Sequence, residues 1–480
     1  MNRRNFLKFN ALSLASLGIA YANPMQSHHA HHSVNHTNLN TSFINFAPKN
    51  LKLLDPNIFP QGEMLKALPL LQNESKKRNF FRAKIDIEES EIELIKGKKT
   101  KFYTYNGSIP APKIEVFEED VVEIIVKNKL KEPTTIHWHG VLVPPEQDGN
   151  PHDPILAGEE RLYRFTIPKD SAGTYWYHPH FISSKQVFMG LAGAFVVKVK
   201  KDALSHFKEK DLMISDLRLD ENAQISNNHL ADWLNGREGE FVLINGQFKP
   251  KITLSSIRIY NATAARYLNL RIQGAKFILV GTDGGLIEKP LFKDELFLSS
   301  ASRAEFLISV PEGGEFKLES LYYDRDKMMV KEEPKEFKEV IMSEDHTQMH
   351  GLMKKGEEDL KKALASMFLL NNKIYDLKRI DLSSKVGVVE DWIIINKSHM
   401  DHPFHIHGTQ FELISSKLNG KIKKAEFRAL RDTINVRPNE ELRLRMKQDF
   451  KGLRMYHCHI LEHEDLGMMG NLEVEDNGND

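Results

Sequence analysis

The sequence is poor in three features that often reveal the class of a protein. It has a single cysteine, Cys458, among 480 residues, so no internal disulfide can form and the thiol is free, buried or a metal ligand. Lys plus Arg equals Asp plus Glu at 66 each, and this balance gives no reason to expect nucleic acid or an anionic membrane surface as a partner. No apolar run of about 18 residues follows the N-terminus, so no membrane-spanning helix is expected.

The N-terminal residues have the composition of an export signal. Two arginines are followed by a modest apolar stretch and by Ala20-Tyr21-Ala22, which fits a small-x-small cleavage site. We therefore expect residues 1–22 to be a twin-arginine signal peptide that directs the chain to the bacterial periplasm. Residues 23–77 form an N-terminal extension with a histidine-rich tract at His28, His29, His31, His32 and His36. Such a tract can bind metal loosely or be a solvated leader, and the sequence leaves both possibilities open.

From about residue 78 onward, short stretches alternate between apolar and polar side chains. Alternation with period two predicts strands that are half buried against a core, and Gly, Pro and Asn separate them. The clearest cases are Tyr163/Phe165/Ile167, Phe195/Val197/Val199, Leu268/Leu270/Ile272 and Leu442/Leu444/Met446. At roughly 100–200 residues per domain, the pattern predicts an all-β protein of about three β-sandwich domains.

One charged region departs from the strand pattern. Within residues 325–370, Leu360, Leu364 and Met367 fall at helical spacing, which predicts a helical insertion or lid. We therefore expect β-sandwich domains at 78–202, 203–330 and 371–480, with a charged, methionine-containing insertion at 331–370.

Histidines with paired spacing carry most of the functional signal. Of the 21 histidines, five lie in the leader and 16 lie in the rest of the chain. Random placement of these 16 would give about half of one His-x-His pair. The chain has four such pairs, His137/His139, His178/His180, His405/His407 and His457/His459. Because residues i and i+2 of a strand point to one face, each pair presents two imidazoles side by side. Eight imidazoles are too many for one metal, but they suit three metal ions that keep positions open for oxygen.

Cys458 lies between two of these histidines and must face the opposite side of its strand. On that side it can meet His402, His463 and Met468. Two histidines, a cysteine and a weak axial methionine are the ligands of a blue copper electron-transfer centre. The odd spacing from His402 to His405 likewise lets one segment serve two sites, so adjacent residues would connect a mononuclear copper to the cluster.

Zinc, iron or a purely structural role accounts for the histidine pattern less well. A structural zinc site uses about four ligands in a closed tetrahedron, whereas this chain offers twelve. Non-haem iron needs only two histidines and one carboxylate. A hydrogen-bonded core histidine accounts for one residue but not for four pairs. We therefore predict that the metal is copper.

Four segments resemble the copper motifs of the multicopper oxidases, a family that includes laccases, bilirubin oxidase, ascorbate oxidase and, most similar, the periplasmic copper-efflux (cuprous) oxidases. They are HWHG at 137–140, HPH at 178–180, HPFHIHG at 402–408 and HCHILEHEDLGMM at 457–469. The resemblance implies three cupredoxin-like Greek-key domains, four copper ions and dioxygen as the electron acceptor. The middle domain would be a spacer without copper. We expect the protein to act as a monomer.

The resemblance also implies a role for each ligand. The type 1 copper would take His402, Cys458, His463 and Met468, the type 2 copper His137 and His405, one type 3 copper His139, His178 and His459, and the other His180, His407 and His457. Asp148 and Glu464 resemble the acids that deliver protons to the cluster in this family. A surface turn acid is the alternative for either residue.

Two kinds of electron donor fit these sites. The first is Cu(I), oxidised to Cu(II) in copper tolerance, and the second is a phenol or aromatic amine, as in laccases. Thioethers select Cu(I), and Met400 stands where the cuprous oxidases have a substrate-binding methionine, with Asp401 beside it. Met349, Met353 and Asp345 of the insertion partly resemble the methionine-rich insertion of those enzymes, although such methionines can also simply pack a helix. A protein that chiefly buffers copper is a remote third possibility, since it would not need the complete cluster.

Overall fold

The computed structural model describes residues 41–200, 204–253, 256–310, 315–325, 338–346 and 356–477. Within them the chain is mostly strand, with four short α-helices, which confirms the all-β prediction. None of the described helices is long and apolar enough to cross a membrane. The predicted signal peptide and the histidine-rich tract lie outside the described residues.

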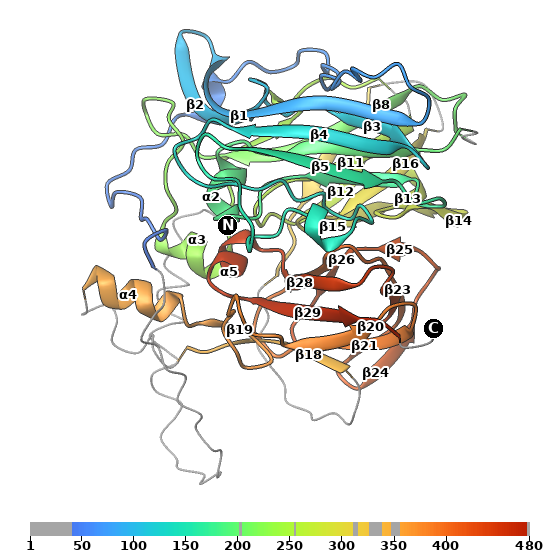
Figure 1. The fold of residues 1–480 in the computed structure, drawn as a ribbon. Coiled ribbons are helices and arrows are strands. Elements are labelled where there is room, and N and C mark those ends of the chain that lie inside the picture. The colour runs from blue at the N-terminus through green and yellow to red at the C-terminus, as the bar shows by residue number, and fades with distance from the viewer. Residues whose placement is uncertain are drawn as a thin grey trace. The chain divides into compact units, whose positions relative to one another are not determined.

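Residues 80–198 form a first group of two sheets around one core (Figure 1). The sheet orders are β2-β1-β4-β5 and β3-β7-β6. The strands are β1 (Phe80–Ile95), β2 (Lys98–Tyr105), β3 (Ile114–Phe117), β4 (Val121–Asn128), β5 (Glu160–Thr166), β6 (Gly173–Tyr177) and β7 (Gly193–Lys198). The predicted alternation holds in β5, where Tyr163 and Phe165 are buried between exposed neighbours. Strand β7 is instead buried on both faces, because Ala194 and Val196 pack against the middle group.

Residues 209–321 form the middle group. Its sheet orders are β10-β9-β8-β11-β16-β13-β14 and β15-β12-β17. The strands are β8 (Glu209–Leu217), β9 (Phe241–Ile244), β10 (Gln247–Phe248), β11 (Ser256–Asn261), β12 (Leu268–Ile272), β13 (Lys276–Thr282), β14 (Gly285–Lys293), β15 (Glu295–Leu298), β16 (Arg303–Ser309) and β17 (Leu318–Leu321). Leu268, Leu270 and Ile272 of β12 are buried in the core of this group, as their alternation predicts.

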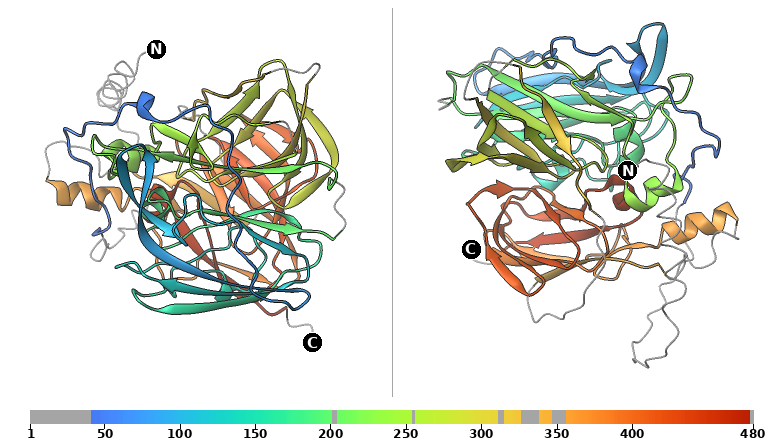
Figure 2. Two further views of the ribbon diagram at one scale, coloured as in Figure 1. Left: turned by 90° about the horizontal axis from the view of Figure 1, so that it is seen from above. Right: turned by 180° about the vertical axis from the view of Figure 1, so that it is seen from behind.

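Residues 338–475 form the third group, which lies together beneath the other two in Figure 1 and in the view from behind in Figure 2. Its sheet orders are β19-β18-β21-β27-β23-β24 and β20-β29-β28-β22-β26. The strands are β18 (Lys338–Glu344), β19 (Phe368–Leu370), β20 (Leu382–Lys385), β21 (Val389–Asn396), β22 (His402–Ile406), β23 (Phe411–Leu418), β24 (Lys421–Lys424), β25 (Leu430–Arg431), β26 (Thr433–Val436), β27 (Glu440–Lys447), β28 (Gly452–Cys458) and β29 (Met469–Glu475). Leu442, Leu444 and Met446 of β27 are buried, as predicted.

The charged region predicted as an insertion at 331–370 contains more than a helix. A helix, α4 (Glu357–Leu364), does form at the predicted spacing. However, β18 pairs in parallel with β21, and its Val340 and Met342 are fully buried. This part of the charged region is therefore built into a sheet, because its apolar residues alternate as in a strand.

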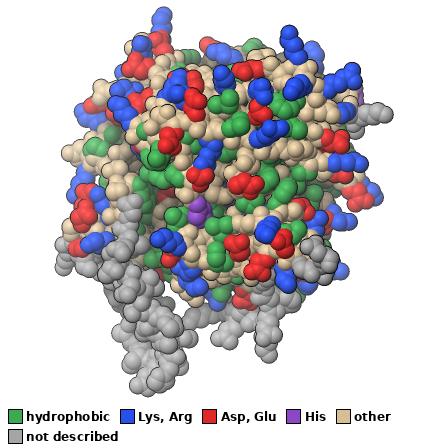
Figure 3. All heavy atoms as spheres, in the orientation of Figure 1, with side chains coloured by type: hydrophobic (Ala, Val, Ile, Leu, Met, Phe, Trp, Pro, Cys, Tyr) green, Lys and Arg blue, Asp and Glu red, His purple; other side chains and the backbone are tan. Residues whose placement is uncertain are grey.

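Three short helices from the three groups pack together. They are α2 (Ser183–Phe188), α3 (Leu230–Asn235) and α5 (Leu461–Asp465). The backbone amides of Ser183 and Ser184 donate to the carboxylate of Asp465, each at 2.9 Å. These bonds tie the first group directly to α5, which follows the cysteine strand β28. Elsewhere, basic and acidic side chains are interspersed over the face drawn in Figure 3, as the balanced composition leads one to expect.

Candidate metal centres

The pairing of β22 with β28 divides the predicted ligands between two faces. Phe404 lies opposite Cys458, and His405 lies opposite His457. Directly opposed residues of antiparallel strands project to the same face, and neighbours along a strand project to opposite faces. Cys458 therefore shares a face with Phe404 and, two residues earlier, with His402. His405 and His457 point to the other face, as the odd spacing from His402 to His405 predicts.

On the first face, His402, Cys458 and His463 form a buried group of possible metal ligands. The Nδ1 atom of His402 lies 3.3 Å from the Sγ atom of Cys458 and 3.4 Å from the Nδ1 atom of His463. Met468 is fully buried, and its backbone carbonyl accepts a hydrogen bond from the Cys458 amide at 3.1 Å. The four residues predicted for the mononuclear site are therefore neighbours.

The outer ring nitrogens of the mononuclear-site histidines are also held. The Nε2 atom of His463 lies 3.3 Å from the carbonyl oxygen of Leu234 in α3, and the ring stacks on Phe368 with centroids 3.8 Å apart. The Nε2 atom of His402 lies 2.8 Å from the Ser398 hydroxyl. Such outer partners set the ring orientation and the tautomer of a metal-binding histidine.

On the second face, the other eight histidines converge, four from the first group and four from the third. His139, His178 and His459 form one buried set, and His180, His407 and His457 form another. In the latter, the Nε2 atom of His457 lies 3.2 Å from that of His180 and 3.1 Å from that of His407. Two nitrogens bound to one tetrahedral metal at about 2.0 Å would lie about 3.3 Å apart. These are the two sets predicted for the type 3 ions.

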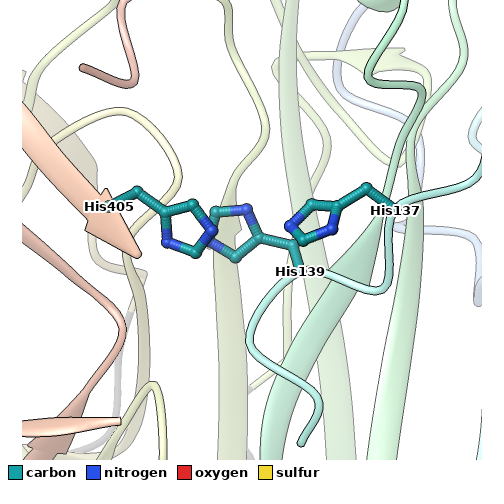
Figure 4. Close-up of side chains that lie close together, drawn as sticks. All are labelled: His137, His139 and His405. Carbon is teal, nitrogen blue, oxygen red and sulfur yellow. The ribbon is translucent and has the colours of Figure 1, made fainter. Parts of the chain in front are cut away.

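His137 and His405 complete this cluster. Figure 4 shows their rings on either side of His139, with His405 reaching in from the third group. The rings of His139 and His405 stack with centroids 3.8 Å apart. His137, His139 and His405 also offer ligand atoms that all lie within 4.8 Å of one another.

Several buried ring nitrogens of the eight histidines lack hydrogen-bond partners among the described residues. They are Nε2 of His137, Nε2 of His405, Nδ1 of His180 and both ring nitrogens of His459. A buried polar atom without a partner is costly and points to an additional partner, such as a bound ion. Metal ions would satisfy Nε2 of His137, Nε2 of His405 and one nitrogen of His459, so the donor set fits the predicted copper cluster.

The protonation states also favour metal binding. Burial lowers the pKa of His180 and of His459 to about 3. It lowers the pKa of His139, His178 and His405 well below the ordinary value. At neutral pH these imidazoles are neutral, and neutral imidazole is the form that binds a metal. The pKa of the Cys458 thiol is raised by burial, so a cation beside it is needed to stabilise the thiolate.

Asp148 is buried against the cluster rather than on the surface. It follows the 3-10 helix η2 (Pro145–Gln147). Its Oδ1 atom lies 3.1 Å from Nδ1 of His137, and its Oδ2 atom lies 3.0 Å from Nδ1 of His407. One carboxylate thus orients histidines of two different ligand sets. Gly149, at φ +71°, allows this approach, because a Cβ atom there would lie 1.8 Å from the Ile136 carbonyl oxygen.

A second buried acid, Asp432, is not indicated by any sequence motif. Its Oδ1 atom lies 3.1 Å from Nε2 of His139, and its backbone carbonyl lies 2.9 Å from Nδ1 of His405. The guanidinium of Arg303, from β16 of the middle group, donates to Asp432 at 2.7 Å. Gly140 of the HWHG motif makes room for the pair, since a Cβ atom there would lie 2.1 Å from the Asp432 carboxylate. Arg303 and Asp432 stand far from any histidine motif, so no local signal marks them.

Glu464 is also buried on the cluster side. Its Oε2 atom lies 3.2 Å from Nδ1 of His457, and its Oε1 atom lies 3.5 Å from Nε2 of His180. The Ser183 hydroxyl donates to Oε1 at 2.5 Å. The two acids singled out in the sequence, Asp148 and Glu464, therefore both contact predicted cluster ligands.

The predicted donor-binding residues are more scattered. Met400 and Asp401 lie beside His402 but are only 1% and 0% exposed. The Asp401 carboxylate accepts hydrogen bonds from Tyr323 at 2.7 Å and from Asn435 at 2.6 Å. Asp345 follows β18, and its amide donates to the Met367 carbonyl at 2.7 Å. Met349 and Met353 lie outside the described residues.

Comparisons with known proteins agree with this geometry. Three family models, each described as multicopper oxidase, match residues 86–202, 210–320 and 343–478. A multicopper oxidase of Staphylococcus aureus is 31% identical over 429 residues, which cover 86% of this chain and 93% of that protein. A laccase of Bacillus subtilis is 24% identical over 497 residues, with 84% and 96% covered. A solved structure described as a multicopper oxidase from Campylobacter jejuni, a metallo-oxidase, is 77% identical with a TM-score of 0.88, covering 91% of this chain and 100% of that one.

Proposed function

The chain belongs to the multicopper oxidase family, and we propose that it holds four copper ions, one at the mononuclear site and three in the cluster. It is thus an oxidoreductase that uses copper. The observation that carries the proposal is the division of twelve ligands between the two faces of β28, with Cys458 on one face and eight imidazoles converging on the other.

We assign the ligands as the motifs predict. The type 1 ion takes His402, Cys458, His463 and Met468, the type 2 ion His137 and His405, and the type 3 ions His139, His178, His459 and His180, His407, His457. Copper bound there supplies one-electron redox chemistry and the reduction of dioxygen to water. The chain connects the sites covalently, because Cys458 lies between His457 and His459 in one strand.

We further propose that Asp148 and Glu464 supply protons at the cluster. Reduction of dioxygen to water consumes protons, and a carboxyl group within reach, directly or through water, can act as a general acid. The Oδ2 atom of Asp148 lies 3.0 Å from His407 and the Oε2 atom of Glu464 lies 3.2 Å from His457, so each acid is one side chain away from the ions.

For the electron donor we propose Cu(I), which makes the protein a cuprous oxidase in copper tolerance. Two observations support this choice. Met400 lies next to Asp401 and two residues before His402, and the relative of 77% identity is described as a metallo-oxidase. Met349, Met353 and Asp345 remain candidate contributors to Cu(I) binding. A laccase-like oxidase of phenols or aromatic amines is the second candidate, favoured by the similarity to a laccase.

From the N-terminal sequence we propose export to the periplasm by the twin-arginine route. We also propose that the protein acts as a monomer and that its domain boundaries lie near residues 203 and 330–370. The predicted copper-free role of the middle domain is supported by its histidine content, since residues 205–330 contain only His206 and His229.

Copper analysis and oxygen uptake test the proposal together. The copper-loaded protein should be blue, contain four copper ions per chain, and consume oxygen with a higher kcat/KM for Cu(I) than for a phenol. Preference for the phenol would establish the laccase-like function. Copper binding without oxygen uptake from either donor would favour the remote alternative, a copper-buffering protein.

A further inference from the structure

A second cluster of metal-binding side chains lies outside the twelve copper ligands. The Glu344 carboxylate, at the end of β18, is only 2% exposed, and its Oε2 atom meets two imidazoles. It lies 2.8 Å from Nε2 of His346 and 2.7 Å from Nδ1 of His399. The two rings have centroids 5.5 Å apart. Two imidazoles and one carboxylate thus converge on one point.

The fold brings these residues together. Strands β18 and β21 are parallel neighbours, so the segments that follow them leave the sheet at the same edge. Glu344 ends β18 and His346 follows it, while His399 stands three residues after the end of β21. The sequence separates the two segments widely, and the parallel pairing makes them neighbours.

The cluster touches the mononuclear site through Glu344. The other carboxylate oxygen of Glu344, Oε1, lies 3.3 Å from Nε2 of His402. The other nitrogen of the His402 ring, Nδ1, lies 3.3 Å from the Cys458 sulfur. A single glutamate therefore joins the imidazoles of His346 and His399 to a ligand of the mononuclear site.

We propose that Glu344, His346 and His399 form the docking site for the Cu(I) ion that the enzyme oxidises, an inference that rests on the proposed function. The site is accessible, since the His346 and His399 side chains are 52% and 36% exposed. Met400 and His402 are at most 1% exposed, so a donor from solvent meets the two imidazoles first. Imidazole is a good ligand for copper.

The carboxylate favours oxidation of the docked ion as well as its binding. An anionic oxygen donor suits Cu(II) better than the softer Cu(I), so the ligand set stabilises the product of electron loss. Each docked Cu(I) would give one electron, through Glu344 and His402, to the copper ion proposed for the mononuclear site, and would leave as Cu(II). Four such ions supply the four electrons that, with four protons, convert one dioxygen to two waters.

The test compares the copper-loaded full-length enzyme with the double variant His346→Ala/His399→Ala. The matched control is His206→Ala, which removes an exposed histidine just before the middle group, with its ring centroid 4.1 Å from that of Phe207. Oxygen uptake is measured against the concentration of Cu(I) and, separately, of a bulky phenol. Equilibrium dialysis with Ag(I), a monovalent ion that does not donate an electron, measures binding without turnover. The blue absorption band reports on the mononuclear site.

We expect the double variant to keep its blue band, to raise KM for Cu(I) about tenfold or more relative to the phenol, and to bind one Ag(I) fewer than the control. Glu344→Gln should lower kcat for Cu(I) as well, because the link to His402 loses its charge. An unchanged KM for Cu(I), or an unchanged Ag(I) count, would overturn the docking site. Equal losses with both donors together with a lost blue band would also overturn it, by showing that these residues only support the copper. If the wild-type enzyme oxidises the phenol but not Cu(I), the proposed cuprous oxidase function itself is refuted. The wild-type measurement alone gives this result, so it is distinguishable from a failure of the docking site, which only the variants can show.

Discussion

The mononuclear site and the cluster differ in how many parts of the chain build them. All four predicted ligands of the mononuclear site come from residues 402–468 in the third group. The cluster takes half of its histidines from the first group and half from the third. The predicted mononuclear ligands therefore come together within the third group, with Leu234 of the middle group holding the outer nitrogen of His463, whereas the predicted cluster exists only when two groups dock. The proposed site of electron entry thus takes its ligands from one group, whereas the proposed site of oxygen reduction needs two.

The cross-group contacts around the cluster reinforce this contrast. Arg303 of the middle group donates to Asp432 of the third, which in turn contacts His139 of the first. Ser183 and Ser184 of the first group bind Asp465 in α5 of the third. The middle group thus contributes no predicted copper ligand, but it does position the acid that orients two of them. It is more than the spacer that the sequence implies.

The largest effect should come from Cys458→Ser. The change removes the thiolate that the blue copper site needs, so the blue band and all turnover should disappear. The cluster ligands lie on the other face of β28 and should stay in place. Absorption spectroscopy and copper analysis check this expectation. A variant that stays blue would show that Cys458 is not the ligand.

Replacing a cluster ligand should give the converse result. In His459→Ala, oxygen uptake should fall to background because one ligand set is incomplete. The blue band should largely persist, since the side chains of the mononuclear site are untouched. Absorption spectroscopy and oxygen uptake are measured on the same sample. Loss of the blue band with retained oxygen reduction would show that His459, and not Cys458, faces the mononuclear site.

Arg303→Ala tests whether the cluster depends on the middle group. Removal of the guanidinium leaves the Asp432 carboxylate buried without its partner, which should cost about 3–5 kcal/mol in the free energy of unfolding. Loss of an outer-sphere partner should slow oxygen reduction by about 10–100-fold, with the blue band unchanged. Denaturant unfolding and oxygen uptake measure the two effects. The control is Arg271→Ala in the same group, because the Arg271 side chain is 45% exposed and its ion pair with Glu319 should contribute little. Equal behaviour of the two variants would mean that the contact between groups does not matter.

The smallest effect should come from Met468→Leu. Methionine is a weak axial ligand in blue copper sites, so its loss should raise the potential of the mononuclear site without releasing the copper. Redox titration of the blue band measures the shift, and the cluster should be unaffected. A colourless variant would show that Met468 is needed to retain copper, or that the neighbouring Met469 is the ligand instead.

Much of this architecture can be predicted from short stretches of the chain. His-x-His on a strand presents two imidazoles to one face whatever surrounds it, and a residue between them must face the other way. For this reason the opposite facing of Cys458 and its neighbours His457 and His459 could be proposed from spacing alone, whereas the ligand sets of His457 and His459 were implied by the family resemblance. The same period-two rule correctly identified buried strands at Tyr163, Leu268 and Leu442.

Contacts between distant segments could not be predicted in this way. Arg303 and Asp432 are separated by 129 residues, and neither belongs to a motif. Glu344 is one charge among many in a region predicted as an insertion, and only the parallel pairing of β18 with β21 brings it next to His399 and His402. The residue spacing along the strands determined by itself which side chains could bind copper, because backbone geometry fixes the directions of near neighbours. That Asp432 and Arg303 also support those ligands, and which surface groups lead to them, was decided only by the packing of the three groups, because burial beside a given histidine depends on the whole fold.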